Sequence, residues 1–160
     1  MIPEIDDATR SLLQEVLKRS CCVIHCENSA MWLSEGDHLV PVLGFGPHAG
    51  KFVGSYSQPL SEGIISMVHA SGQPFCENHI HRNPQHSSRL DQQLGIQTDA
   101  MIAVPVISNG EIIGVITCVH TSPAGQAGIT HSFQASDMAE LEYATALAGR
   151  VMGSIRSISG

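Results

Sequence analysis

The densest group of side chains able to do chemistry lies in residues 76–86. Cys76, His79, His81 and His86 stand close together there, and a thiolate with imidazoles at this spacing could converge on zinc, iron or haem. Histidines outnumber lysines plus arginines, 9 against 8, so some clustering is expected by chance. The favoured interpretation is a polar segment without a metal, and these four residues are the ligands to test if one is bound.

An anionic ligand beside this segment would need a positive partner. Arg89 is the first candidate, because its planar guanidinium group matches a carboxylate or a phosphate. Arg82 is a second candidate, although a surface charge at a helix end is the favoured interpretation for it.

A second group of thiols, Cys21, Cys22 and Cys26, lies around His25. Residues 21 and 25, like residues 22 and 26, are about one helical turn apart and share a helix face. A redox or metal role is one interpretation, but small buried cysteines that fill a helix–sheet contact are the more common case. Cys118 alternates into an apolar strand and is expected in the core.

Composition narrows the function classes. The chain has 8 basic and 15 acidic residues, a net charge of −7 and no run of lysine or arginine, so direct nucleic-acid binding is not expected. No apolar run reaches the ~18 residues that span a bilayer, so no membrane insertion is expected. An odd number of cysteines, 5, without a signal peptide favours reduced thiols and a cytoplasmic location.

The elements that must position these residues are organised around residues 99–121. Two apolar, β-branched runs flank Asn109-Gly110, a pair that tolerates the positive φ angles of a type I′ hairpin turn. The runs are too apolar for either face to meet water, so the hairpin is expected inside a sheet covered on both faces. Pro105 suits a bulge or strand end, and Gly114 leaves room for a neighbouring element to approach closely.

Helical and strand periodicity predicts the remaining elements. A tail at 1–6 precedes a helix at 7–25, and a closing helix spans 136–156 with an Asp137/Glu140 capping box. The elements between them are strands at 30–34 and 38–45, a loop at 44–54, a helix capped by Ser61 and ended by Gly72, a strand at 73–76, a polar segment at 77–98 with a helix at 87–94, and a loop at 122–132.

Several phrases then occur in an order typical of one family. They are the residues at 59–65 (PLSEGII), 70–74 (ASGQP), 104–106 (VPV) and 109–115 (NGEIIGV), and Phe133 followed by Asp137 and Leu141. With these phrases the chain resembles a GAF domain over nearly its whole length, and residues 1–160 are interpreted as one such domain.

The resemblance implies an α+β fold. It consists of a central antiparallel sheet of about five to six strands, with the terminal helices packed on one face and a ligand pocket under an irregular lid on the other. It also implies a small-molecule ligand, a homodimer through the terminal helices, and a separate output domain such as a kinase, cyclase, phosphodiesterase or transcription activator. The lid is the polar segment at 77–98, and the ligand-binding residues expected in it are Glu77, Asn78, His79, His81, His86 and Arg89.

The favoured function is a non-enzymatic sensory domain of a bacterial-type signalling protein, with its cofactor, if any, left open. Alternatives are a haem or metal sensor through residues 76–86, a dimerisation module with a vestigial pocket, and a thiol-dependent methionine sulfoxide reductase. The reductase type has a pocket cysteine just before the VPV strand, where this chain has Asp99-Ala100-Met101, and Cys76 alone cannot both attack and resolve. The cyclic-nucleotide type is also disfavoured, because Met138 stands in place of its glutamate and no Asn-Lys pair occurs.

Overall fold

The computed structural model describes residues 2–126 and 132–159. The strands are β1 (Asn28–Glu35), β2 (His38–Phe45), β3 (Gln58–Pro59), β4 (Phe75–Glu77), β5 (Ile96–Ser108) and β6 (Glu111–Pro123). The helices are α1 (Asp7–Ile24), α2 (Ala49–Phe52), α3 (Ile64–Ser71), the 3-10 turn η1 (Ile80–Arg82), α4 (Arg89–Leu94) and α5 (Ala135–Ser159). None of the helices described is long and apolar enough to cross a membrane.

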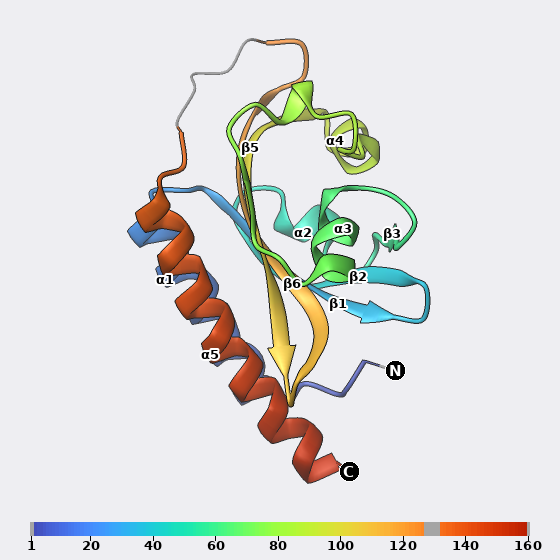
Figure 1. The fold of residues 1–160 in the computed structure, drawn as a ribbon, viewed down its shortest axis with the longest axis vertical. Helices are drawn as coiled ribbons and strands as arrows, with labels where there is room; N and C mark the ends of the chain where they lie inside the picture. Colours follow the sequence, from blue (N-terminus) through green and yellow to red (C-terminus); the bar gives the residue numbers. More distant parts are fainter. Residues whose placement is uncertain (1, 127–131, 160) are drawn as a thin grey trace.

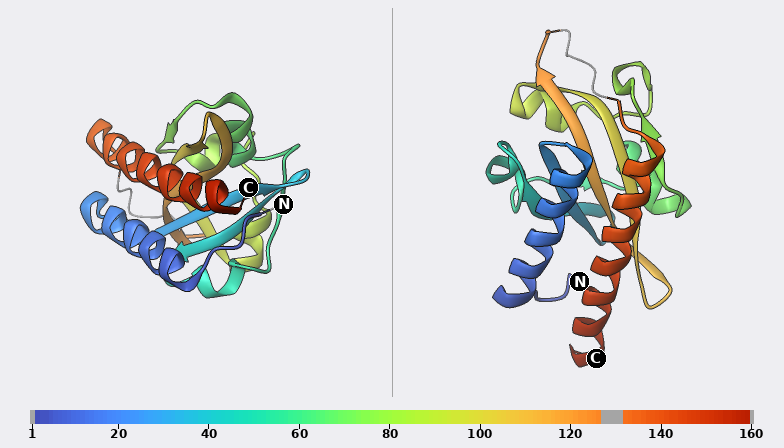
Figure 2. Two further views of the ribbon diagram at one scale, coloured as in Figure 1. Left: turned by 90° about the horizontal axis from the view of Figure 1, so that it is seen from below. Right: turned by 90° about the vertical axis from the view of Figure 1, so that its left-hand side faces the viewer.

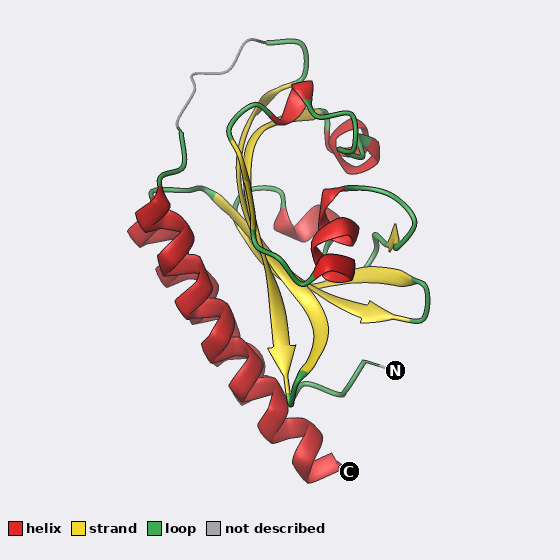
Figure 3. Cartoon of the chain, in the orientation of Figure 1, coloured by secondary structure: helices red, strands yellow, loops and turns green. Residues whose placement is uncertain are grey.

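The strands form one antiparallel sheet in the order β3-β2-β1-β6-β5-β4. Figure 1 shows three layers, with α1 and α5 on one face of this sheet and α2, α3 and α4 on the other. The same layers are visible by element type in Figure 3, and Figure 2 shows α1 and α5 lying side by side. The predicted α+β architecture, with terminal helices on one face, is therefore confirmed.

The β5–β6 hairpin lies inside the sheet, as predicted. Its turn has positive φ at both central residues, 52° at Asn109 and 78° at Gly110, which fits the right-handed twist of the flanking strands. Pro105 pairs in register with Val115, and the irregularity lies one residue later, between Val106 and Ile107. The prediction of a bulge or strand end at Pro105 itself is therefore wrong by one position.

Alternation along the strands builds a separate core on each face of the sheet. On β1, Met31 and Leu33 belong to the cluster beneath α1 and α5, whereas Ala30 and Trp32 belong to the cluster beneath α3. Successive strand residues point to opposite faces, so this period-2 pattern covers the sheet on both sides and leaves neither face to water.

Both terminal helices form where periodicity predicts them. The Asp6 carboxylate caps α1 by accepting a hydrogen bond from the Thr9 N–H at 2.7 Å, and Leu13 and Leu17 are buried. Leu12 is 51% exposed, because it lies on the outer side of the helix.

The start of α5 differs from the prediction. The helix begins at Ala135, and Asp137 lies in its first turn, where its carboxylate accepts the N–H of Gln134 at 2.7 Å. Glu140 forms an ion pair with Arg19 of α1. The predicted capping box is therefore wrong, because Asp137 plays the reciprocal role in the first turn and Glu140 joins the two terminal helices.

Two smaller differences concern the face of the sheet that carries α2, α3 and α4. Helix α3 begins after Gly63, whose φ is +89°, so Ser61 does not cap it. The predicted loop at 44–54 contains α2, a single turn too short to show a periodic pattern. Part of the loop predicted at 122–132, residues 127–131, lies outside the described residues.

Candidate functional site

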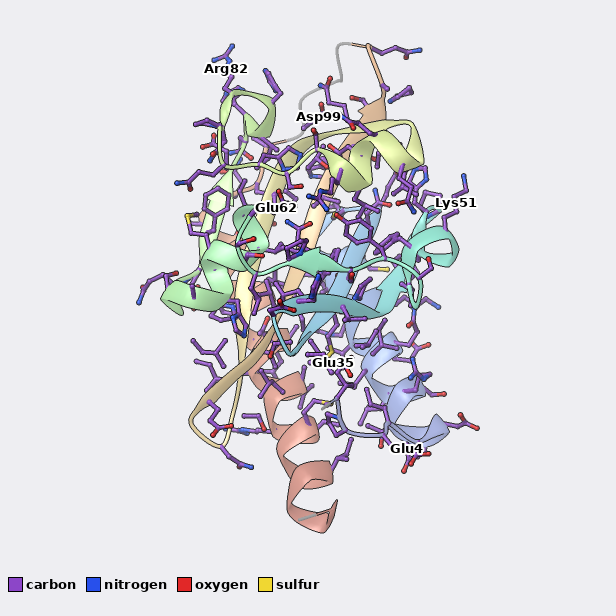
Figure 4. All side chains as sticks on the ribbon, turned by 90° about the vertical axis from the view of Figure 1, so that its right-hand side faces the viewer. Glu4, Glu35, Lys51, Glu62, Arg82 and Asp99 are labelled. Atoms are coloured by element: carbon purple, nitrogen blue, oxygen red, sulfur yellow. The ribbon has the colours of Figure 1, made fainter. Side chains whose placement is uncertain are left out.

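A cavity of about 90 Å³ lies between the sheet and the helices α2, α3 and α4. Figure 4 looks onto this side of the molecule, where these helices cover the strands. The sheet contributes the floor, and the helices contribute apolar walls. Apolar lining residues include Ala30, Trp32, Phe45, Phe52, Ile64, Ile65, Leu90, Leu94, Met101 and Val119.

The cavity is small for a ligand site. Its volume corresponds to about three water molecules at ~30 Å³ each, whereas pockets for drug-sized ligands measure ~300–1,000 Å³. The cavity in this conformation therefore suits a very small molecule, and a larger one would have to displace a wall.

Two polar atoms of the cavity lining are buried without a hydrogen-bond partner among the described residues. They are the indole nitrogen Nε1 of Trp32 and the imidazole nitrogen Nδ1 of His48. A buried polar group that lacks a partner costs ~1–3 kcal/mol. These atoms are therefore the ones that a ligand with a hydrogen-bonding group would stabilise.

Helix α4 is the wall that is least embedded, since none of its residues is buried. Asp91 holds it in place: its carboxylate accepts hydrogen bonds from the backbone N–H and the hydroxyl of Thr98, both at 2.8 Å. The same carboxylate lies 3.1 Å from Nε2 of His86. One acidic side chain thus ties the lid helix to the start of β5 and to the preceding loop.

A second link joins α4 to Glu62, which lies two residues before the start of α3. Arg89 Nη2 lies 2.8 Å from Oε1 of Glu62 in an ion pair, with the Arg89 side chain 60% exposed. Figure 4 labels Glu62 beside α3. Arg89 does not belong to the cavity lining, so its guanidinium group lies at the outer surface and not against the cavity.

The sequence-predicted binding residues are not brought to one place. His86 lines the cavity, but His79 and His81 are exposed around η1, with ring centroids 6.3 Å apart. Glu77 accepts the backbone N–H of His79 at 3.1 Å, and the side chain of Asn78 hydrogen-bonds to the backbone N–H and carbonyl of Phe133. Whether any of these residues contacts a ligand stays a prediction.

The ligand set proposed for a metal does not converge either. Cys76 is exposed on the edge strand β4, and its thiol does not group with His79, His81 or His86 at metal-binding distances in the described structure. Among the described residues, three thiols do lie within such distances of one another. They belong to Cys21, Cys26 and Cys118, on the opposite face of the sheet.

Sequence reasoning missed His48, Gln58 and Asp91 as cavity residues. His48 precedes the single-turn helix α2 and Gln58 begins the two-residue strand β3, and such short elements show no periodic pattern. Asp91 looks like an ordinary surface carboxylate on a short helix. Trp32 belongs to the core on this face of the sheet and also lines the cavity.

Comparison with known proteins identifies the fold independently. A family model described as the GAF domain matches residues 9–155. No curated protein matches the chain.

Solved structures with the same fold are distant in sequence. The GAF domain from a phosphoenolpyruvate-protein phosphotransferase of Coxiella burnetii is 18% identical, with a TM-score of 0.80 over 94% of this chain and 85% of that one. The free methionine-R-sulfoxide reductase of Neisseria meningitidis is 17% identical, with a TM-score of 0.72 over 93% and 80%. The nlh2 GAF domain of A. aeolicus is 24% identical, with a TM-score of 0.64 over 98% and 89%. At these identities the likeness concerns the fold alone.

Proposed function

The chain belongs to the GAF domain family, and we propose that it is a non-enzymatic sensory domain that binds a small molecule in the cavity under α4. The observation that carries this proposal is the cavity itself, a mostly apolar space in which Trp32 Nε1 and His48 Nδ1 lack partners. Sites for small molecules are typically apolar with a few polar groups that fix orientation.

The lining also indicates the chemistry of the ligand. No lysine or arginine lines the cavity in the described structure, and the carboxylate of Asp91 does. An anion placed there would be buried beside the Asp91 carboxylate with no ammonium or guanidinium partner, which is costly. The proposed ligand is therefore small and uncharged, mostly apolar, and carries one acceptor for the Trp32 N–H.

Catalysis has less support. The alternative of a thiol-dependent reductase needs cysteines at the ligand, but no cysteine belongs to the described lining of the cavity. Cys76 is exposed on β4, and the remaining buried thiols lie beneath α1 on the other face.

The signal would leave through the β5–β6 hairpin and α5. Met101 lines the cavity while its neighbour Ile102 belongs to the core beneath α1 and α5. Since neighbouring strand residues face opposite sides of the sheet, a ligand that reshapes one core displaces residues of the other. Figure 1 shows α5 continuing past the turn of the hairpin, where an output domain could attach.

The terminal helices also support a homodimer. Leu12 and Val23 of α1 and Tyr143 and Leu147 of α5 are large apolar side chains exposed by 39–66%. Exposed apolar groups of this size on two adjacent helices are typical of an interaction surface. Sedimentation analysis of a Tyr143→Asp/Leu147→Asp variant should give a monomer, with Ala70→Asp, at an exposed position of α3 on the other face of the sheet, as the control.

Trp32 gives the ligand proposal a built-in reporter, because it is the single tryptophan of the chain. A panel of small amides, ketones and aromatic alcohols, screened beside carboxylates and phosphates, should contain uncharged compounds that change tryptophan fluorescence and raise the melting temperature. Trp32→Phe keeps an aromatic ring at this position but removes the indole N–H, and should weaken binding by about 5- to 10-fold. Melting temperature reports binding in that variant.

A cavity-filling variant separates this site from surface binding. Ala49→Leu places extra atoms in the cavity wall and should abolish binding, whereas Ala70→Leu adds the same atoms at an exposed position of α3. Equal binding by both variants, or binding confined to anions, would contradict the proposal.

A further inference from the structure

The face of the sheet away from the cavity holds three buried thiols in one cluster. Cys21 comes from the last turns of α1, Cys26 from the connection to β1, and Cys118 from the middle of β6. Their Sγ atoms all lie within 4.8 Å of one another, and the residues are 2%, 6% and 0% exposed, respectively.

An unusual backbone conformation brings the third thiol to the other two. His25 ends α1 with φ 60° and ψ 47°, a left-handed conformation that non-glycine residues rarely adopt. It turns the chain back so that the Cys26 N–H donates to the Cys21 carbonyl at 2.9 Å. Strained residues of this kind concentrate at functional sites, and here the strain places a thiol.

The spacing suits a metal ion bound by three sulfurs. With metal–sulfur bonds of ~2.3 Å, trigonal or tetrahedral geometry places the sulfurs about 3.8–4.0 Å apart. The cluster is already near this size, so binding would need only small side-chain adjustments. Thiolates are the ligands that soft ions such as Cu(I) and Zn(II) prefer.

The thiol of Cys26 donates to two backbone carbonyls. Its Sγ lies 3.0 Å from the Val119 oxygen and 3.2 Å from the Asn28 oxygen. A cation bound by this sulfur would take the place of its proton.

We propose that Cys21, Cys26 and Cys118 form a three-coordinate Cu(I) site, independent of the cavity and of any ligand bound there. Structural zinc sites have four protein ligands, and catalytic ones keep a position open to solvent. This cluster fits neither kind of zinc site. No fourth histidine, cysteine or carboxylate atom joins it among the described residues, and its buried thiols leave no position open to solvent. Each thiol that becomes a ligand releases its proton to solvent, up to three per ion.

The site would give the domain a second input. The site joins α1 to β6, so a bound ion would hold α1 against the β5–β6 hairpin. The other side of this hairpin lines the cavity.

The test is anaerobic competition between the full chain and a coloured Cu(I) chelator. The expected result is one Cu(I) bound per chain, with X-ray absorption giving three sulfur neighbours at ~2.3 Å. Cys26→Ser and Cys118→Ser should each weaken binding by at least about 100-fold, since loss of supporting groups outside the ligand set already costs ~10–100-fold. Cys22→Ser and Cys76→Ser are matched controls at exposed thiols, and should bind as the parent does.

A measurement on the unmodified protein covers the case in which a core variant fails to fold. Cu(I) should raise the melting temperature of the unmodified protein, because an ion held by three core thiols binds only the folded state. No retention of Cu(I) against the chelator, binding that depends on Cys22 or Cys76, or formation of a Cys21–Cys26 disulfide in place of Cu(I) binding would overturn the proposal.

Discussion

The backbone carbonyl of Trp32 occupies the space in which a side chain of Gly114 would lie, since a Cβ built there would overlap the oxygen atom. These residues lie diagonally across β1 and β6, where Trp32 pairs with Val115 and Leu33 with Gly114. The same Trp32 lines the cavity with its indole ring. The close strand contact and the cavity wall therefore depend on one residue.

Gly114→Ala should be strongly destabilising. The added methyl group must push β1 away from β6, and overpacking of this kind costs ~1–3 kcal/mol. Urea denaturation would measure the loss in free energy of unfolding, and the fluorescence of Trp32 would report the displaced wall. Gly50→Ala is the matched control, because nothing lies within 4 Å of its Cβ position; an equal loss at both positions would contradict the close contact.

Asp91→Ala should loosen the lid helix α4. The change removes the acceptor for the N–H and hydroxyl of Thr98, a residue only 5% exposed, and a buried group without its partner costs ~1–3 kcal/mol. Hydrogen exchange of α4 and the β5 start should become faster. Asp91→Asn keeps one acceptor oxygen and should lose less, whereas Gln93→Ala at an exposed position should leave exchange unchanged.

His25→Gly should stabilise the protein. The left-handed conformation costs a residue with a Cβ ~1–2 kcal/mol, part of which glycine loses again through its greater freedom in the unfolded chain. A gain of about 0.5–1 kcal/mol in the free energy of unfolding is expected. His79, whose φ is −134°, is the control: His79→Gly should give no gain, and a loss on His25→Gly would show that the side chain itself stabilises the fold.

Asp6 should make the stability of α1 depend on pH. The hydrogen bond from the Thr9 N–H lowers the pKa of the Asp6 carboxyl below its value in the unfolded chain. A lowered folded-state pKa stabilises the protein above the unfolded pKa, and this stabilisation is lost as pH falls through the folded-state pKa. Asp6→Ala should therefore lower the melting temperature at neutral pH, with a difference that shrinks on acidification. Ser11→Ala, an exposed and uncharged position of the same helix, is the control and should not show this shrinkage.

The elements that sequence predicted well are those whose signal is local. Asn109-Gly110 specified a hairpin because few residue pairs tolerate two positive φ angles, and alternating apolar runs specified strands covered on both faces. The terminal helices followed from apolar residues at helical spacing. Their starts were less certain, as Asp137 shows, because a carboxylate can cap a helix from either side of its first residue.

The candidate site was predicted only in part, because it depends on contacts between distant segments. The histidines at 79 and 81 look like ligands in sequence, yet η1 leaves them exposed, whereas His48 reaches the cavity from an irregular stretch. Polar residues in short, irregular segments have no periodicity from which their direction can be inferred.

Sequence by itself determined the family, the α+β class and the central hairpin, since propensity, turn chemistry and apolar period act over a few residues. Tertiary structure alone decided which side chains meet. Cys118 lies more than 90 positions after Cys26 in sequence, yet its Sγ lies within 4.8 Å of that of Cys26 because β6 pairs with β1 beneath α1. The pairing of strands sets such distances, and no local pattern records them.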